Sequence, residues 1–198
     1  MGYQLQITAD GVVARFANQL AAVGEAKAKQ ALQRAIAHTG DKAKTQVIRA
    51  LTKQTGLKRA VIVRAVDVQR PSYDDLRYVM TTRGGDVSLK YFSPRETARG
   101  VSAAAFGRRS VHEGTFMRAG WWPGRRVQKD NWNGQVFRRT GNITRKGEGM
   151  DEFEKAESGV VIPEQMVKGM TEAAWRRVAD RDLANRIGHE LGRMLGGR

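Results

Sequence analysis

The chain has 198 residues, with 35 Lys/Arg against 20 Asp/Glu, a formal net charge of +15 and no cysteine. This length supports one hydrophobic core without covalent cross-links, and the lack of cysteine excludes a disulfide framework, a thiolate metal site and a thiol nucleophile. No apolar run reaches the roughly 20 residues of a membrane-spanning helix, and the first residues lack the apolar region of a signal peptide. We therefore expect a soluble, unprocessed protein without membrane contact.

The first 70 residues have helical spacing and form the first part of a single predicted domain, 1–198. Apolar residues three and four positions apart predict a helix from Asp10, as its N-cap, to Val23. Gly24 then interrupts the pattern. The next element therefore begins after this glycine.

A longer helix is predicted over 28–51, because Ala, Lys and Gln in this stretch are strong helix formers. Gly40-Asp41 lies inside it and predicts a kink or a division of the helix. Thr55-Gly56 ends the helix, and a short helix is predicted over 57–66. Pro71 ends the helical N-terminal part.

The middle part, 71–150, carries most of the excess positive charge. Residues 83–149 hold 14 Lys/Arg against 5 Asp/Glu, 11 of the 22 glycines and three of the four tryptophans. So concentrated a positive field repels itself unless a partner of opposite charge is near. This composition predicts an extended surface that binds a polyanion or another protein.

The same part has strand patterns. A hairpin is predicted where 76–80 and 87–92 flank Gly84-Gly85, because two glycines supply the backbone angles of a tight turn. The remaining pattern predicts a meander with long basic arms. Its further strands are predicted over 98–106, 115–118 and 135–139, and its loops at Arg108-Arg109, Trp121–Arg126 and Thr140–Gly149.

The last part, 151–198, predicts a short strand over 160–162 followed by helices. Pro163-Glu164 suits the first turn of a helix. The apolar face slips in phase near 179–182, so two helices or one bent helix are expected. The chain as a whole predicts an α+β fold in which N-terminal helices and C-terminal amphipathic helices pack on a small antiparallel β-sheet with long basic loops.

The sequence indicates no catalytic centre, cofactor or metal. His38, His112 and His189 fall in separate segments without a second ligand at metal spacing. No phosphate-binding loop, nucleophile elbow or dinucleotide fingerprint occurs. An acidic cluster lacks the spacing of a calcium loop; it is expected to be a solvated loop, with contact to a basic patch of a neighbouring copy as an open alternative, and consists of Asp151, Glu152, Glu154 and Glu157.

Arginine pairs and tryptophans are the candidates for partner binding. Paired arginines suit phosphate contacts, whereas tryptophans either stack on bases or cover a core or a subunit contact. The residues predicted to face DNA or an acidic partner are Arg108, Arg109, Arg125, Arg126, Arg138, Arg139, Arg145 and Lys146. Those predicted at a subunit or partner interface are Phe116, Trp121, Trp122 and Trp132.

A helix-turn-helix is also conceivable over 41–66. Its second helix would give much of the reading face to Val61, Ile62 and Val63. Three aliphatic residues give little discrimination between bases. Ordinary packing explains them more simply.

Four features follow one another along most of the chain. They are the Ala-rich helix 28–51, the basic helix that begins with Thr55–Ala60, the sequence Gly114-Thr115-Phe116 before a Trp-bearing loop, and Val161-Ile162-Pro163 before paired helices. This layout resembles that of the minor tail protein Z family of tailed bacteriophages and prophages, which are tail-completion or neck proteins. The resemblance lies in the order of elements rather than in a residue motif. The segment 120–149 is particular to this sequence.

The resemblance implies a structural virion protein, without enzymatic activity, that is assembled in the host cytoplasm and lies at the head-proximal end of the tail. It implies a homo-oligomeric, hexameric ring that contacts the tail terminator and the head-tail connector and touches genome DNA non-specifically. Two alternatives from other classes stay open. One is a basic nucleic-acid-binding module, associated with ribosomes or DNA, and the other is an unrecognised hydrolase.

Overall fold

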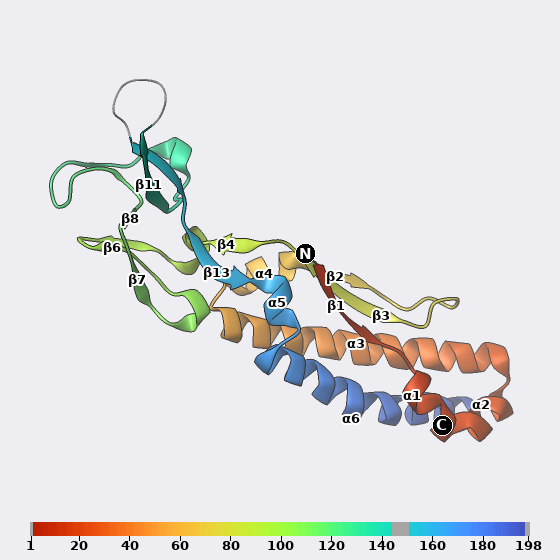
Figure 1. Ribbon diagram of the computed structural model, residues 1–198. Coiled ribbons are helices and arrows are strands. Elements are labelled where there is room, and N and C mark those ends of the chain that lie inside the picture. Colours follow the sequence, from red (N-terminus) through yellow and green to blue (C-terminus); the bar gives the residue numbers. More distant parts are fainter. Residues whose placement is uncertain (1, 144–150, 197–198) are drawn as a thin grey trace.

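Two long helices form the spine of an α+β fold (Figure 1). The computed structural model describes residues 2–143 and 151–196. Helix α3 (Glu25–Thr55) and helix α6 (Gly169–Met194) run antiparallel and pack against each other. Ala, Leu and Ile recur at three- and four-residue spacing on the buried side of α3, as expected for an amphipathic helix. No helix in these two ranges is long and apolar enough to cross a membrane.

The N-terminal helix is more divided than the sequence predicts. Helices α1 (Asp10–Val13) and α2 (Ala17–Val23) are separated by a short 3-10 turn. Ala9 is the N-cap of α1, so the prediction that Asp10 caps the helix is wrong. Asp10 lies in the first turn, where a carboxylate is stabilised by the positive end of the helix. Gly24 separates α2 from α3, as predicted.

A three-stranded antiparallel sheet also packs on the helices. Its strands β1 (Gly2–Ile7), β3 (Tyr78–Arg83) and β2 (Val66–Gln69) lie in the order β1-β3-β2, and β3 contacts α3. Neither β1 nor β2 was predicted. Tyr3, Leu5 and Ile7 of β1 alternate with glutamines, which is a pattern typical of a strand, whereas the four-residue β2 directly follows helix α4 (Arg59–Ala65). Pro71 therefore follows a strand, not a helix as predicted.

Gly40 joins α3 to this sheet instead of breaking the helix. The ring of Tyr78 in β3 lies so close to Gly40 that a Cβ at this position would collide with it. The Tyr78 hydroxyl donates to Asp41 Oδ1 at 3.0 Å, and Arg70 donates to Asp41 Oδ2 at 2.9 Å. Burial, with the Asp41 carboxylate, raises the pKa of Tyr78. The predicted kink is wrong, because α3 is continuous through this contact.

The predicted hairpin around Gly84-Gly85 is also wrong. Strand β3 pairs with β1 and β2, whereas β4 (Asp86–Ser88) pairs with β13 (Glu157–Val161), so the two flanks of the turn do not pair with each other. The Asp86 carboxylate accepts hydrogen bonds from the backbone N–H groups of Ser158 at 3.0 Å and Gly159 at 2.8 Å. A long-range contact therefore determines the partner of β4.

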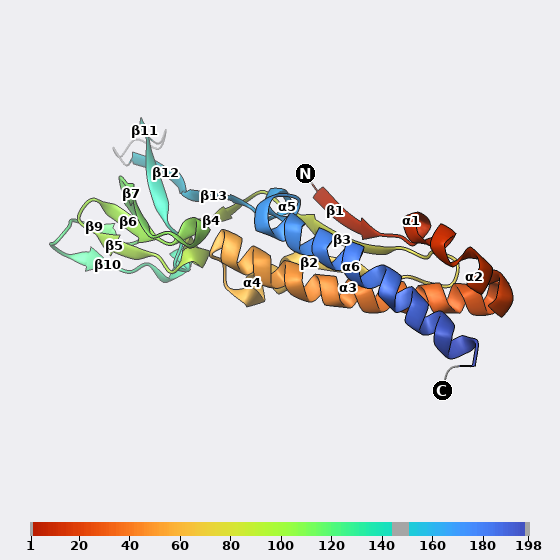
Figure 2. The ribbon, with the colours of Figure 1, turned by 90° about the horizontal axis from the view of Figure 1, so that it is seen from below.

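Three small antiparallel sheets form the head, which we define as residues 89–143 and 151–156. The head lies at one end of the elongated molecule, and the body, residues 2–83 and 162–196, extends to the other (Figure 2). The pair β4–β13 connects them. The sheets of the head have the orders β5-β6-β7, β12-β11-β8 and β10-β9; their strands are β5 (Arg95–Thr97), β6 (Gly100–Ala103), β7 (Ser110–Glu113), β8 (Thr115–Phe116), β9 (Ala119–Gly120), β10 (Arg126–Val127), β11 (Phe137–Ile143) and β12 (Asp151–Lys155).

The head and the body meet at the end of α3. Gly56 caps α3 in the left-handed region at φ +77°, as the sequence predicts. A side chain at Gly56 would collide with the backbone of Ala104 and Gly107, which belong to a 3-10 turn of the head and its N-cap. Glycine is therefore required here both for its backbone angle and for the close approach of the two parts.

The C-terminal helices are divided earlier than expected. Pro163 lies in the first turn of α5 (Ile162–Met166), as predicted, but α6 is unbroken through 179–182. The interruption falls at 167–168, where Gln54 of α3 bonds both sides of the turn. Its amide donates to the Gln165 carbonyl at 3.1 Å and accepts from the Thr171 N–H at 3.2 Å. A side chain from a distant helix thus provides a cap that local sequence does not show.

Candidate interaction surface

The most exposed aromatic side chains lie at the tip of a short hairpin in the head. Strands β9 and β10 pair antiparallel and form the arm, residues 119–127. Trp121 is 84% exposed and Trp122 is 48% exposed. Exposed single apolar residues are common in proteins, but two adjacent tryptophans at a loop tip concentrate a large apolar area. The prediction of a loop at Trp121–Arg126 holds for its tip, and Arg126 begins β10.

A largely buried ion pair fastens this arm to the rest of the head. Arg126 of β10 pairs with Glu96 of β5, and their side chains are only 14% and 9% exposed. Arg126 also donates to the backbone carbonyls of Gly120 at 2.6 Å and Arg118 at 3.0 Å. Glu96 accepts a further bond from the Met117 N–H at 3.3 Å. Because a buried charge is costly without its partner, these bonds hold the arm in one position.

Four aromatic rings form a cluster beside the arm. Their centroids lie 5.0 to 6.1 Å apart, mostly in edge-to-face or tilted arrangements that favour aromatic pairing. The rings come from β8, the 3-10 turn Asp130–Trp132, β11 and β12, and they belong to Phe116, Trp132, Phe137 and Phe153. Two predicted interface residues, Phe116 and Trp132, therefore already pack within the chain.

A groove of about 780 Å³ runs between the cluster and the arm. Trp121 and Trp122 of the arm and Phe116 and Phe153 of the cluster all line this groove, and Phe153 is 43% exposed. The guanidinium of Arg139 lies 5.5 Å from the centre of the Phe116 ring, a cation–π arrangement. The groove thus offers aromatic surface with a positive rim to an approaching chain.

The predicted arginine pairs are largely used inside the chain. Arg109 donates to the carbonyls of Ser102 and Ser93, both at 3.1 Å, and Arg138 pairs with Glu154 at 2.7 Å. Arg108 and Arg125 are exposed. Together with Arg126 and Arg139, this places one or both members of every described pair in contact with the chain itself. Arg145 and Lys146 lie outside the described residues.

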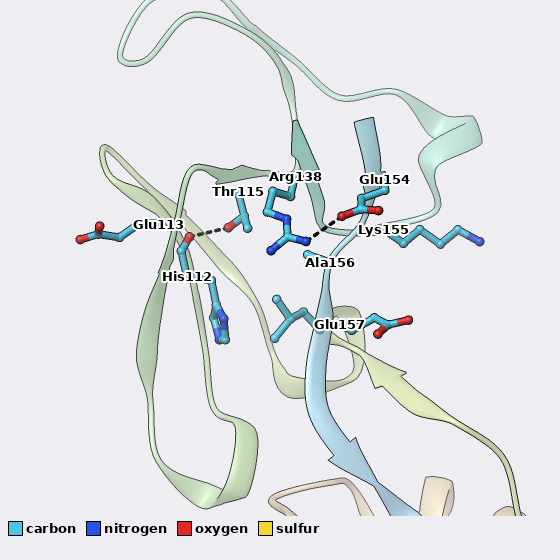
Figure 3. Close-up of a pocket in the computed structure, with 9 residues that line it drawn as sticks. His112, Glu113, Thr115, Arg138, Glu154, Lys155, Ala156 and Glu157 are labelled. Carbon is cyan, nitrogen blue, oxygen red and sulfur yellow. Dashed lines mark hydrogen bonds and ion pairs between the residues drawn. The ribbon is translucent and has the colours of Figure 1, made fainter. Parts of the chain in front are cut away.

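A polar pocket of about 590 Å³ lies between β7 and the paired strands β11 and β12 (Figure 3). The Thr115 hydroxyl donates to the His112 carbonyl at 2.6 Å and accepts from the Val101 N–H at 3.0 Å. Figure 3 shows the His112 ring directed away from the ion pair between Arg138 and Glu154. His112 Nε2 is buried and has no hydrogen-bond partner among the described residues. Within the described residues, the Thr115 hydroxyl is hydrogen-bonded to backbone groups and not to the His112 ring, so these two side chains do not form a nucleophile–base pair.

The other predicted polar candidates are dispersed. His38 and His189 are exposed on α3 and α6. The acidic cluster is not a loop as expected: most of it lies on β12, and Glu154 neutralises Arg138 across the strand pair. Within residues 2–143 and 151–196, no three His, Asp or Glu side chains are grouped to hold a metal ion.

Sequence reasoning missed Glu96 and Phe153 as parts of this surface. Phe153 stands between Glu152 and Glu154, and this alternation is typical of a strand with one apolar face. It could have placed Phe153 beside the other aromatic residues. Glu96 had no such signal, because its partner is 30 positions away.

Comparison of the chain with protein-family models, curated proteins and solved structures finds no match.

Proposed function

We propose that this protein is a structural subunit of a tailed-phage virion, a tail-completion or neck component that joins the tail to the head connector. The observation that carries the proposal is the arm, which exposes Trp121 while a largely buried ion pair holds its base in place. Fixing an apolar side chain in water costs free energy that binding to a partner recovers. Tryptophan is also among the residues that contribute most to protein interfaces. The arm is therefore a pre-organised docking element.

The elongated arrangement supports an assembly role. The arm lies in the head, far along the molecule from α1, α2 and the C-terminus (Figure 2). A subunit of this shape reaches one neighbour with its head while its body packs elsewhere in a ring. The layout that resembles the minor tail protein Z family supports the same role, with a homo-oligomeric ring, tail terminator and head-tail connector as partners. In this proposal the ring surrounds the DNA passage and the protein is not an enzyme.

A second candidate is a basic nucleic-acid-binding module. The exposed Arg108 and Arg125 favour it. Base stacking by Trp132 is less favoured, because its ring packs against Phe116 and Phe137. The two candidates differ in what the tryptophans contact.

The double substitution Trp121→Ala and Trp122→Ala tests the docking role. We expect a folded chain with unchanged circular dichroism that forms rings, seen by negative stain, only at concentrations about tenfold higher or more, as for the loss of an anchor worth 1.4 kcal/mol or more. Tyr73→Ala, which removes a 45% exposed aromatic ring from the body, is the matched control and should assemble normally. Equal assembly by the double variant and the wild type would refute the anchor role.

A further inference from the structure

The exposed side of α3 carries a continuous row of polar residues. The row contains no acidic and no apolar side chain, and at 1.5 Å per residue it extends over about 35 Å. Its members recur every three or four positions and are Gln30, Arg34, His38, Lys42, Gln46, Arg49 and Lys53. All but the half-buried Gln46 are exposed.

Helix α6 adds further basic residues beside this row. A shallow depression of about 370 Å³ between the two helices is lined by Lys42 and Gln46 from α3 and by Arg177 and Arg181 from α6. Lys42 is neutralised by Asp182, with Nζ 2.5 Å from the carboxylate. The other basic residues of this surface have no ion-pair or hydrogen-bond partner in the described parts of the chain; we call them the basic face, and they are Arg34, Arg49, Lys53, Arg177 and Arg181.

We propose that the basic face binds the phosphate backbone of double-stranded DNA without sequence specificity. Five unneutralised cations on rigid helices attract a polyanion and release its counterions on binding. The row is about as long as one helical turn of B-DNA, about 34 to 36 Å. It therefore matches the repeat of the duplex as well as its charge.

The composition of the row favours a duplex over other partners. It lacks aromatic side chains, on which the bases of single-stranded nucleic acid would stack. It also lacks the large apolar anchors typical of a protein interface. Phosphate contacts alone carry no sequence information. These properties suit DNA that must slide past the protein.

This inference deepens the DNA-passage part of the proposed function, because it assigns the DNA contact to the body rather than to the head loops. Docking by the arm does not depend on it. The experiment below measures DNA binding by the unassembled chain, whereas the tryptophan experiment measures assembly. Failure of one is therefore distinguishable from failure of the other.

The test is titration of the full chain with a 30-base-pair duplex at several salt concentrations. With five phosphate contacts, log K should fall against log salt with a slope of about −4.5, so affinity should drop about 500-fold between 50 and 200 mM salt. The triple substitution Arg34→Gln, Arg49→Gln and Lys53→Gln should reduce the slope to about −2. Circular dichroism and thermal melting check that this variant folds.

A charge-matched variant distinguishes the basic face from the head. Arg99→Gln, Arg108→Gln and Arg125→Gln remove three exposed charges from the head, and this variant should keep most of the wild-type slope. A larger loss in this variant, or an equal loss in both, would overturn the assignment. Tighter binding of single-stranded DNA than of the duplex would overturn it as well. Stronger competition by polyglutamate than by duplex DNA would point to an acidic protein partner instead.

Discussion

The body and the head of this molecule use the same residue types in opposite ways. In the body, apolar side chains are buried between α3, α6 and the sheet, while the cations of the basic face remain unpaired at the surface. In the head, arginines such as Arg126 and Arg138 are paired within the chain, while Trp121 and Trp122 face solvent. The contrast indicates that overall charge density alone does not identify the surface available to a partner.

The largest expected effect is at the ion pair that holds the arm. Glu96→Ala leaves the Arg126 guanidinium largely buried and uncompensated, which costs about 3 to 5 kcal/mol. We expect hydrogen exchange to accelerate across residues 117–127 while the helices of the body keep their protection. Exchange rates measured by mass spectrometry test this difference between the two regions.

The control for this prediction is Glu154→Ala. It removes the partner of Arg138 from a pair in which both side chains are more than half exposed, so the cost should be about 1 kcal/mol or less. A response as large as that of Glu96→Ala would show that burial does not distinguish the two pairs. Equal protection of the arm in Glu96→Ala and wild type would contradict the anchoring role.

A smaller effect is expected inside the body. Gly40→Ala inserts a methyl group against the Tyr78 ring and should lower the free energy of unfolding by about 1 to 3 kcal/mol. Gly192→Ala is the matched change on α6, where an added Cβ meets no atom within 4 Å. It should stabilise by up to about 1 kcal/mol. Urea unfolding of both variants measures the contrast, and destabilisation by both would contradict the assigned contact.

The smallest expected effect concerns alkaline pH. Because folding raises the pKa of Tyr78 above its ordinary value of 10.0, the neutral hydroxyl is favoured in the folded state. The stabilisation that the neutral Tyr78 hydroxyl gives to the folded state is complete below pH 10 and is lost as the pH rises above that value. Tyr78→Phe should therefore be less stable than wild type at neutral pH but lose less stability above pH 10. Parallel pH dependence of the two proteins would contradict a perturbed tyrosine.

Local patterns in the sequence predicted where the long helices lie, because residue spacing is a local signal, but the N-cap of α1, the kink in α3 and the break near 179–182 were predicted wrongly. The C-cap of α3 at Gly56 and the first turn of α5 at Pro163 follow from single residues. Strand pairing was mispredicted for a physical reason. The partner of β4 is determined by Asp86 binding the backbone at Ser158 and Gly159, more than 70 positions away, and no local turn signal reports this contact.

The interaction surface was predicted in part. Trp121 and Trp122 are exposed, as an interface role requires, but Phe116 and Trp132 pack into a cluster with rings from distant strands. The sequence of an arginine pair also does not show whether its side chains bind a partner or form ion pairs and hydrogen bonds within the chain. The basic face was missed because its members are spread over two helices, α3 and α6, whose overall composition is typical of solvated surfaces.

The most direct test of the docking proposal is to measure the solvent accessibility of Trp121 before and after assembly. Hydroxyl-radical footprinting of the free chain and of assembled rings should show strong labelling of Trp121 in the free chain and protection in the ring, with Tyr73 labelled in both. Equal labelling of Trp121 in free and assembled protein would contradict the proposal that the arm is a docking element.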